Sequence, residues 1–249
     1  MIFNLFKAKP TLKELIPSGF VDIHSHILPG IDDGAKNIEE SLTLIDKIER
    51  LRCKKIIATP HIYPGLYDNT EIEIKKKYFS FKEFTNSNSN INIDIACEYM
   101  MDISLIEKCD KKELLTLSNN YILLETSFST LPNYFYEVVY HLSVNNYKII
   151  LAHPERYLYL FKNKREIYKL KKTGIKFQLN ALSLTGYYGK ESMKLCDTML
   201  GEELFDFIGS DIHNIKHIEE INSSKVRINR GNLKKLNKLF ENNLSIFGD

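Results

Sequence analysis

The sequence predicts a barrel-like α/β fold of seven parallel strands with helices on the outside, and three observations support this prediction. From residue 20 onward, short apolar segments alternate with segments whose apolar residues recur at helical spacing. Such alternation is typical of parallel strands, because a crossover helix is needed to join them. Histidines and acids recur at the C-terminal ends of the strands, from the first strand to the last. In a barrel these ends meet at one mouth, whereas the outer strands of an open sheet lie too far apart to share a site.

The first half of the chain is expected to contain three strands after a short helix at Leu12–Leu15. The apolar run that begins at residue 20 predicts the first strand, and the buried segment 54–61 predicts the second. Between them, apolar residues three or four positions apart over 36–52 predict a helix. A polar helix is expected over 69–84, and the Asn- and Ser-rich stretch 85–90 is expected to be a loop. Alternation with period two predicts the third strand, over 91–98.

The second half repeats the strand–helix unit four times. Apolar segments predict the remaining strands, and helical spacing predicts the helices that follow them. No break in composition marks a domain boundary, so we expect one domain over 20–249 and an N-terminal extension over 1–19. The expected strands are 121–125, 147–154, 174–181 and 204–211, and the expected helices are 134–142, 165–172, 191–200 and 229–243.

The bulk composition argues against several classes of function. With 34 basic and 32 acidic residues the net charge is +2, which gives no support for binding nucleic acid or membranes through overall charge. No apolar run approaches the ~18 residues of a membrane span, and residues 1–19 lack the features of a signal peptide. Four cysteines without a C-x-x-C pair indicate reduced thiols in a cytoplasmic protein. None is followed six positions later by Arg, so the Cys-x5-Arg loop of cysteine-dependent phosphatases is absent.

Five of the seven histidines and three acids fall at the ends of the predicted strands. Each taken alone could be a hydrogen-bonded structural residue or a helix cap. Together they would crowd several carboxylates into one place, which is costly unless a cation compensates. Imidazoles with carboxylates suit Zn²⁺, Mn²⁺ or Fe, and the absence of Cys argues against a closed structural zinc site. The residues are His24, His26, His61, Glu98, Glu125, His153, Asp211 and His213.

Two further histidines and an acidic turn have simpler interpretations. His141 falls on a predicted helix and His217 in what we expect to be a polar loop, so both are interpreted as structural. Asp32 and Asp33 lie in the segment "GIDDG" after the first strand, where Asp and Gly are typical turn residues.

The ordered motifs "DIHSH", "TPHI", "CE", "LLE", "AHPER" and "SDIH" resemble the polymerase and histidinol phosphatase (PHP) family. Within it, "DIHSHILPGIDDGA" and "AHPERY" are most similar to the bacterial manganese-dependent protein tyrosine phosphatases of capsule and exopolysaccharide operons. The resemblance extends from about Phe20 to at least His213. It implies a distorted (β/α)7 TIM-like barrel, with the metal site at the C-terminal ends of the strands.

The resemblance also implies three divalent metal ions, for which Mn²⁺ is expected and Fe or Zn are the other candidates. Glu98 would bridge the first two metals, and Asp33 is preferred to Asp32 as the ligand from the acidic turn. The implied ligands are His24, His26, Glu98 and Asp211 for the first metal, Glu98, Glu125 and His153 for the second, and Asp33, His61 and His213 for the third.

The implied reaction is attack on phosphorus by a hydroxide that bridges the metals, with Glu98, His153 and Arg156 as catalytic residues. Arg156 would bind a non-bridging phosphate oxygen as a two-donor fork. The alternative for Arg156 is a surface ion pair with the neighbouring Glu155. The resemblance leads us to expect a second Arg shortly after "SD-x-H", but the chain has Lys216 there and reaches Arg only at Arg227. These two residues are therefore the candidates for a second phosphate contact.

The leading hypothesis is a phosphatase that acts on the phosphotyrosine-bearing tail of a polysaccharide-export tyrosine kinase. A small-molecule phosphatase of the histidinol-phosphatase type is the alternative, since only the mouth of the barrel would differ. An amidohydrolase would be expected to have Lys in place of Glu125, and a non-catalytic metal-stabilised module should have lost ligands. Six aromatic residues could flank a phenyl phosphate or simply pack the barrel: Tyr63, Tyr67, Tyr99, Phe128, Tyr134 and Tyr157.

Overall fold

A computed structural model of the chain describes residues 8–85 and 91–249. Positions 86–90 of the expected Asn- and Ser-rich loop lie outside the described residues. All strands pair in parallel, in a sheet of order β1-β2-β4 and a sheet of order β3-β5-β6-β7-β8-β9. The strands are β1 (Phe20–Ser25), β2 (Cys53–Ala58), β3 (His61–Ile62), β4 (Asn92–Ile95), β5 (Glu98–Met100), β6 (Tyr121–Glu125), β7 (Lys148–Ala152), β8 (Lys176–Asn180) and β9 (Phe207–Gly209).

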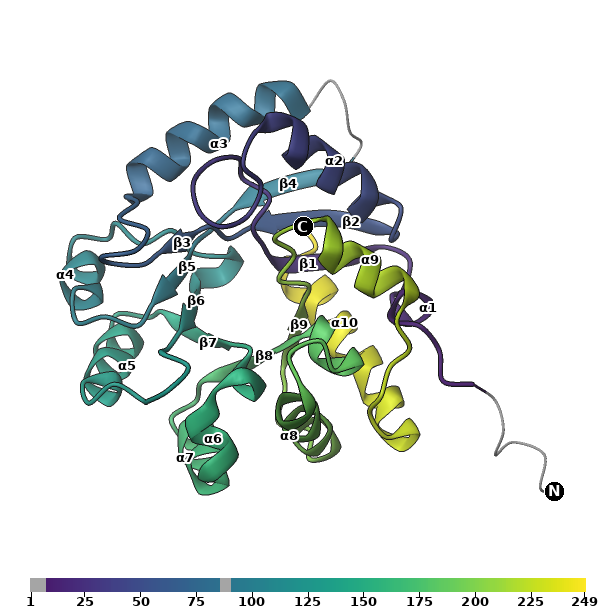
Figure 1. The fold of residues 1–249 in the computed structure, drawn as a ribbon. Helices are drawn as coiled ribbons and strands as arrows, with labels where there is room; N and C mark the ends of the chain where they lie inside the picture. The colour runs from purple at the N-terminus through teal and green to yellow at the C-terminus, as the bar shows by residue number, and fades with distance from the viewer. Residues whose placement is uncertain (1–7, 86–90) are drawn as a thin grey trace.

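Helices surround the strands, which follow one another around the middle of the molecule (Figure 1). The short helix expected near the N-terminus is confirmed, and its Thr11 forms a capping box with Glu14. Three helices of the described part were not predicted: α4, α6 and α9. The helices are α1 (Leu12–Leu15), α2 (Ile38–Glu49), α3 (Glu71–Thr85), α4 (Leu105–Asp110), α5 (Phe135–Val144), α6 (Leu158–Lys162), α7 (Lys164–Lys172), α8 (Lys190–Gly201), α9 (Ile215–Ser223) and α10 (Leu236–Phe247).

Two of the seven expected strands are each broken into two. The segment 54–61 forms β2 and β3, and the segment 91–98 forms β4 and the first residue of β5. Pro60 lies in the first break, where it has no N–H to continue the ladder, but its carbonyl accepts a hydrogen bond from Glu98 N–H (3.1 Å). Each broken segment thus contributes one strand to each sheet. The parallel α/β fold is confirmed, whereas the strand pairing consists of two sheets and does not show one closed barrel.

The two sheets are joined by hydrogen bonds just after β9. Asp211 N–H donates to the carbonyl of His24 (2.8 Å), and His26 N–H donates to the carbonyl of Ile212 (2.9 Å). Ser25 and Ile212 form a parallel bridge at the same place. The pairing of β1 with β2 is irregular between Asp22 and Ser25. The end of β1 therefore lies directly beside the residues that follow β9.

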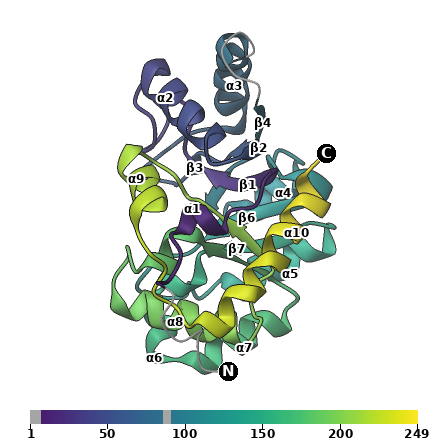
Figure 2. The same ribbon diagram turned by 90° about the vertical axis from the view of Figure 1, so that its right-hand side faces the viewer.

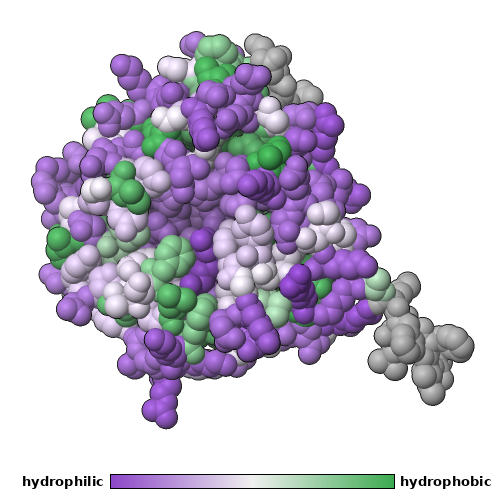
Figure 3. Space-filling view, in the orientation of Figure 1, coloured by the Kyte–Doolittle hydropathy of each residue, from purple (hydrophilic) through white to green (hydrophobic). Residues whose placement is uncertain are grey.

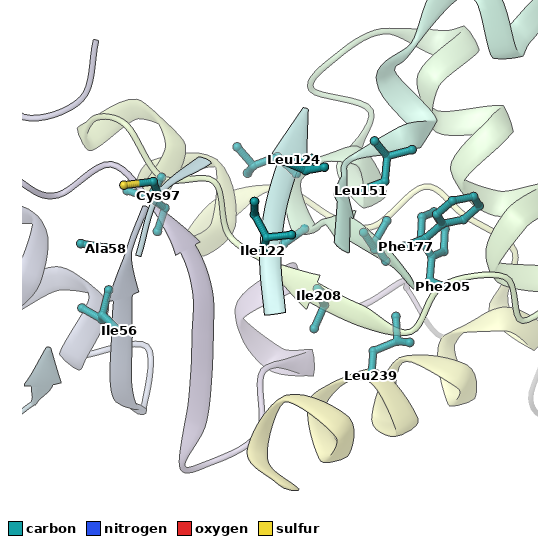
Figure 4. Packing of buried hydrophobic residues seen from close by; sticks show 14 of the residues in the cluster. Ile56, Ala58, Cys97, Ile122, Leu124, Leu151, Phe177, Phe205, Ile208 and Leu239 are labelled. Carbon is teal, nitrogen blue, oxygen red and sulfur yellow. The ribbon is translucent and has the colours of Figure 1, made fainter. Parts of the chain in front are cut away.

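Buried apolar side chains form two clusters on different sides of the strands. The larger lies between the strands and the helices; Figure 4 shows Ile208 of β9 facing Leu239 of α10. The smaller combines residues from β1, β2, β6, β7 and β9 with Phe247 near the end of α10. Figure 2 shows α10 running along the side of the molecule. Among the described residues, no helix is both long and apolar enough to cross a membrane.

Asn243 of α10 is fully buried and connects the two sheets. Its Nδ2 donates to the carbonyls of Val21 in β1 (2.9 Å) and Ile208 in β9 (2.5 Å), and its Oδ1 accepts from Ile208 N–H (3.2 Å). Loss of this amide would leave three buried backbone groups without their partner, and each such group is costly.

We predict that Asn243→Leu lowers the free energy of unfolding by about 2–4 kcal/mol, because buried backbone groups lose their hydrogen bonds. Urea denaturation measures this change. The matched control is Asn242→Leu, which removes a half-buried amide that makes one hydrogen bond, to the carbonyl of Asp206. The control should lose about 1 kcal/mol. Equal losses in the two variants would contradict a special role for Asn243.

Candidate metal centre

Most of the predicted strand-end residues line one small cavity of about 190 Å³, and the fully buried His24 and His26 contact Glu98 and Asp211 of its lining. Figure 3 shows a hydrophilic hollow near the middle of the face seen in Figure 1. His24 belongs to β1, His61 opens β3, Glu98 opens β5, and Glu125 closes β6. The others follow strands β1, β7 and β9. The residues that line the cavity are Asp33, His61, Tyr63, Leu66, Tyr67, Glu98, Glu125, Phe128, His153, Arg156, Asp211 and His213.

Four fully buried side chains form the first group of potential ligands, and they are the set implied for the first metal. His24 Nε2 lies 3.0 Å from Glu98 Oε2 and 3.3 Å from Asp211 Oδ1. His26 Nε2 lies 3.4 Å from each of the same two carboxylates. Their potential ligand atoms all lie within 4.8 Å of one another, which is compatible with one ion between them.

Two further groups of potential ligands at the cavity share His61, which differs from the sets implied by the resemblance. Its Nδ1 lies 3.3 Å from Glu98 and 3.4 Å from Glu125, forming one group with these acids. Its Nε2 lies 3.7 Å from Asp33, in a group that also contains His26 and His213. His153, expected beside Glu98 and Glu125, has Nε2 3.1 Å and 3.9 Å from them. His61 thus lies between two groups, because β3 pairs with β5 in a register that places His61 opposite Glu98.

The acidic turn after β1 folds back toward the cavity. Ala35 N–H donates to the carbonyl of His26 (3.1 Å), and a Cβ at position 34 would overlap that carbonyl oxygen, so Gly34 is required there. Asp33 is half exposed, and its Oδ1 lies 3.4 Å from His213 Nε2. Asp32 is buried and accepts hydrogen bonds from His26 Nδ1 (2.8 Å) and His61 N–H (3.0 Å). Asp33 therefore faces the potential ligands, whereas Asp32 orients the ring of His26 by accepting a hydrogen bond from its Nδ1.

The buried carboxylates of the cavity are unequally compensated: although burial opposes it, the nearby His24 helps to hold the pKa of Glu98 and of Asp211 well below its usual value, whereas Glu125 behaves in the opposite way. Burial, together with the nearby Glu98 and Asp211, raises the pKa of Glu125 well above its usual value. Burial, helped by Arg156, lowers the pKa of His153 to about 4, so this imidazole is neutral and able to bind a metal. His61 Nδ1 and His153 Nδ1 are buried without a hydrogen-bond partner. Unpaired imidazole nitrogens beside crowded carboxylates are a donor set that suits divalent cations.

The backbone is strained at two of these residues. His153 has φ 33° and Asp211 has φ 54°, both in the left-handed region of the backbone that residues other than Gly rarely adopt. His153 also precedes Pro154, which further restricts its conformation. Such strain costs of order 1–3 kcal/mol per residue and is typical of functional sites.

Arg156 lies at the wall of the cavity and not on the open surface. Its Nη1 donates to Asp211 Oδ2 (2.7 Å), and its guanidinium lies 4.9 Å from the ring centre of Phe128 and 4.0 Å from that of Tyr188. The surface ion pair with Glu155 that we considered does not form. Glu155 is fully buried and accepts from Asn180 N–H (2.9 Å) and the hydroxyl of Ser183 (2.7 Å). Arg156 is therefore held in a fixed plane, with its side chain 20% exposed.

The two residues proposed for a second phosphate contact lie in different places. Lys216 is exposed and lines a neighbouring hollow of about 750 Å³ together with Asp33 and His213. Arg227 is exposed near Lys9 and Lys225 and does not line the cavity of the strand ends. The geometry thus places Lys216 nearer to the candidate site than Arg227.

The two remaining histidines differ in how well they match the sequence interpretation. His141 lies in α5, with Nε2 2.7 Å from Asp110 Oδ1, and does not line the cavity. His217 was expected in a polar loop, and this was wrong. It lies buried in α9, with Nδ1 3.1 Å from the carbonyl of Asp211, because Asn214 caps a helix that starts at Ile215.

Sequence reasoning missed three buried polar residues that contact the potential ligands. Asp22 accepts hydrogen bonds from the N–H of His24 (3.3 Å) and from the N–H (2.9 Å) and hydroxyl (2.5 Å) of Ser210, next to Asp211. Gln178 contacts His24, and Asn180 contacts Asp211. The available signal was weak: two amides at alternate positions of the otherwise apolar strand segment "FQLN".

The six aromatic residues that could flank a phenyl phosphate lie partly in the core and partly at the cavity. Tyr99 and Tyr157 are fully buried in the core, and Tyr134 is half buried outside the cavity. The ring of Tyr67 stacks on that of His61 (5.5 Å between centres), and Phe128 stacks on His153 (5.9 Å). Tyr67 and Phe128, together with Tyr63 and Leu66, therefore form an apolar rim around the potential ligands.

The four cysteines are free and buried, as expected from the absence of paired motifs. Burial raises the pKa of each thiol, so the thiolate needed for nucleophilic attack is disfavoured. The cysteines do not line the cavity of the strand ends. The chemistry of this site therefore rests on imidazoles, carboxylates and Arg156.

Comparison with known proteins gives consistent matches. YwqE of Bacillus subtilis, a tyrosine-protein phosphatase, is 30% identical over 198 residues, covering 79% of this chain and 78% of its own. CpsB of Streptococcus pneumoniae, also a tyrosine-protein phosphatase, is 28% identical over 202 residues, covering 78% and 83%. A solved structure from work on these two metal-dependent tyrosine phosphatases has a TM-score of 0.74 at 30% identity, covering 81% and 84%.

More distant structures share only the fold. Histidinol phosphate phosphatase of Lactococcus lactis has a TM-score of 0.52 at 11% identity, covering 90% of this chain and 94% of its own.

The family model for capsular polysaccharide synthesis proteins of the CpsB/CapC type matches residues 20–244, nearly the whole chain. The chain therefore belongs to the CpsB/CapC family of capsular polysaccharide synthesis.

Proposed function

We infer that this protein is a metal-dependent protein tyrosine phosphatase, a hydrolase of phosphoric monoesters. The observation that carries this inference is that five imidazoles, four carboxylates and one guanidinium either line one small cavity or lie directly against the residues that line it. Family membership and the two tyrosine-protein phosphatases of similar sequence support the same activity. The buried thiols, with raised pKa values, make a cysteine nucleophile a poor alternative.

We propose that the cavity holds three divalent ions, with Mn²⁺ as the expected metal and Fe or Zn as alternatives. Bound divalent ions would supply a hydroxide nucleophile and stabilise negative charge on the phosphate. The proposed ligands include His61 toward both neighbouring groups, which the distances to Glu98 and Asp33 support. The full proposed set is His24, His26, Asp33, His61, Glu98, Glu125, His153, Asp211 and His213.

The residues of the chain have distinct proposed roles. Glu98 contacts His24 through Oε2 and His153 through Oε1, so its carboxylate spans two groups and suits a bridging ligand. Arg156 would donate to a non-bridging phosphate oxygen, because Phe128 and Tyr188 hold its guanidinium flat at the cavity wall. Its position requires no rearrangement during the reaction, which favours stabilisation of the transition state.

The rim of the cavity favours an aromatic phosphoester over an aliphatic one. Tyr67 and Phe128 stack on two proposed ligands, so a ring that enters the cavity would pass between apolar surfaces. The potential ligands lie below this rim and are mostly buried, which suits a long phosphotyrosine side chain better than the shorter phosphoserine. Lys216 is the candidate for a further contact with substrate at the neighbouring hollow, and Arg227 is a weaker candidate.

Three wider proposals concern the setting of this activity. We propose that the substrate is the phosphotyrosine tail of a polysaccharide-export tyrosine kinase, which the capsular family supports. We propose that residues 20–249 form the phosphatase domain, in which the two sheets are arcs of a distorted (β/α)7 barrel, and that 1–19 are an extension. The hydrogen bonds between β1 and the residues after β9 support such an arrangement. Four free thiols support a cytoplasmic location.

The proposed function predicts a specific order of substrates. Purified protein with Mn²⁺ should hydrolyse a phosphotyrosine peptide faster than a phosphoserine peptide or histidinol phosphate, because the apolar rim favours a ring. Chelation should abolish turnover and Mn²⁺ should restore it, whereas a thiol reagent applied to the folded protein should change little. Preference for histidinol phosphate would favour the small-molecule alternative, and loss of activity on thiol modification without unfolding would refute the metal mechanism.

Removal of the proposed bridging carboxylate should lower the metal content. Glu98→Ala is expected to lose more than one ion per chain, because two groups share this side chain. Elemental analysis of the purified variant measures the loss. The matched control is Glu137→Ala, at an exposed position of α5 outside the cavity, which should keep the wild-type content. Equal metal content in both variants would argue against the bridge.

Replacement of Arg156 should affect catalysis more than metal binding. Arg156→Ala is expected to lower kcat/KM about 10²-fold, or about 3 kcal/mol, because one charge-assisted contact to phosphate is lost. Metal content should persist, since Asn180 still holds Asp211 (2.7 Å). Arg156→Lys should recover part of the loss, because a point charge cannot reproduce the planar fork. Steady-state kinetics within twofold of the wild type would exclude a role in phosphate binding.

A further inference from the structure

Strand β8 carries no residue of the metal-binding types, yet its two amides contact two of the proposed ligands. Gln178 and Asn180 are fully buried at the C-terminal half of the strand. Gln178 Oε1 lies 3.0 Å from His24 Nδ1, and Asn180 Nδ2 lies 2.7 Å from Asp211 Oδ2. Each amide is also anchored to the backbone at its other end, which fixes its direction.

The anchoring of Gln178 decides where the proton of His24 lies. Gln178 Nε2 donates to the carbonyl of Leu179 (2.6 Å), and a carbonyl can only accept, so this end of the amide must be the NH₂ group. The oxygen therefore faces His24 Nδ1, and since it too can only accept, Nδ1 must carry the proton. Nε2 lies inside the first group of ligands, 3.0 Å from Glu98 Oε2, so with Nδ1 protonated it is the nitrogen that would give up its proton and offer its lone pair to a bound cation.

Asn180 acts on the other side of the same group. Its Oδ1 accepts from Leu182 N–H (2.9 Å), so the NH₂ group must point toward Asp211. Asp211 Oδ2 thus receives hydrogen bonds from both Asn180 and Arg156 (2.7 Å). The second oxygen, Oδ1, is left facing His24 (3.3 Å) and the rest of the group.

A glycine on the next strand makes room for this arrangement. A Cβ at Gly209 would lie 2.6 Å from His24 Cβ and 2.9 Å from Gln178 Nε2, closer than real side chains approach. The absence of a side chain on β9 therefore allows His24 and Gln178 to meet. The contact between β1 and β8 depends on this position, although the two strands are not paired with each other.

We propose that Gln178 and Asn180 are positioning residues that set the metal affinity of the first group, Gln178 by fixing the tautomer of His24 and Asn180 by directing Asp211 Oδ1. This inference rests on the proposed metal site but not on the identity of the substrate. Both are neutral amides, so they orient ligands without adding charge to a cavity already crowded with carboxylates. Loss of such partners behind a ligand typically weakens metal affinity 10–100-fold.

The test compares Mn²⁺ affinity by titration calorimetry of the metal-free protein. Gln178→Met should bind the tightest Mn²⁺ about 10–100-fold more weakly, because His24 can then take either tautomer. The matched control is Asn243→Leu, which removes another fully buried amide far along the sequence and should bind Mn²⁺ as the wild type does despite lower stability.

An independent measurement needs no variant. In the wild-type protein loaded with the diamagnetic ion Zn²⁺, ¹⁵N NMR of the histidine side chains should show His24 with its proton on Nδ1. A proton on Nε2, wild-type affinity in Gln178→Met, or equal weakening in Asn243→Leu would each overturn the proposal. Failure of the proposed function is distinguishable, because absence of phosphatase activity in the metal-bound wild type would leave these affinities and spectra unchanged.

Discussion

The crowding of buried carboxylates at the ends of the strands is the constraint on which the rest of this structure depends. Glu98, Glu125 and Asp211 lie within one cavity and are almost completely buried. Burial of unpaired charge costs several kcal/mol per ion, so such a cluster persists only with positive charge or N–H donors around it. The raised pKa of Glu125 has the same cause, since burial and the nearby Glu98 and Asp211 disfavour a negative charge there. Imidazoles, one guanidinium and the proposed metals balance this charge.

The fold places these groups by interrupting regular strands. The break at Pro60 lets His61 open a new strand opposite Glu98, and the pairing of β1 with β2 is irregular between Asp22 and Ser25, around His24. The left-handed backbone at His153 and Asp211 aims both side chains at the cavity at a cost in conformational strain. The apolar clusters on both sides of the strands stabilise the scaffold that holds this strain. Local irregularity at the strand ends thus coincides with the site.

In the proposed function, hydrolysis of the phosphoester and recognition of the substrate side chain take place in different parts of the cavity. Imidazoles and carboxylates from the strand ends form its floor, where a phosphate would be attacked. Arg156 stands at the wall, fixed between Phe128 and Tyr188. Aromatic and apolar residues from the loops form the rim, where the substrate side chain would be recognised. Because loops tolerate change more readily than strand ends, the proposed division would let the rim vary while the floor is kept.

The sequence by itself determined the α/β class, the positions of most strands, and the residues that meet at their ends. It could do so because parallel strands present their C-terminal ends on the same side, and because motifs such as "DIHSH" and "SDIH" keep chemically distinctive side chains close in the chain. It could not identify Gln178 and Asn180, since an isolated amide has no motif and its partner His24 is 154 positions away. The burial of His217 and the true partner of Arg156 were missed for the same reason. A hydrogen bond between side chains of distant strands forms only when a donor atom of one lies opposite an acceptor atom of the other. Here the packing of β1, β8 and β9 against one another decides which atoms lie opposite, and the sequence does not show it.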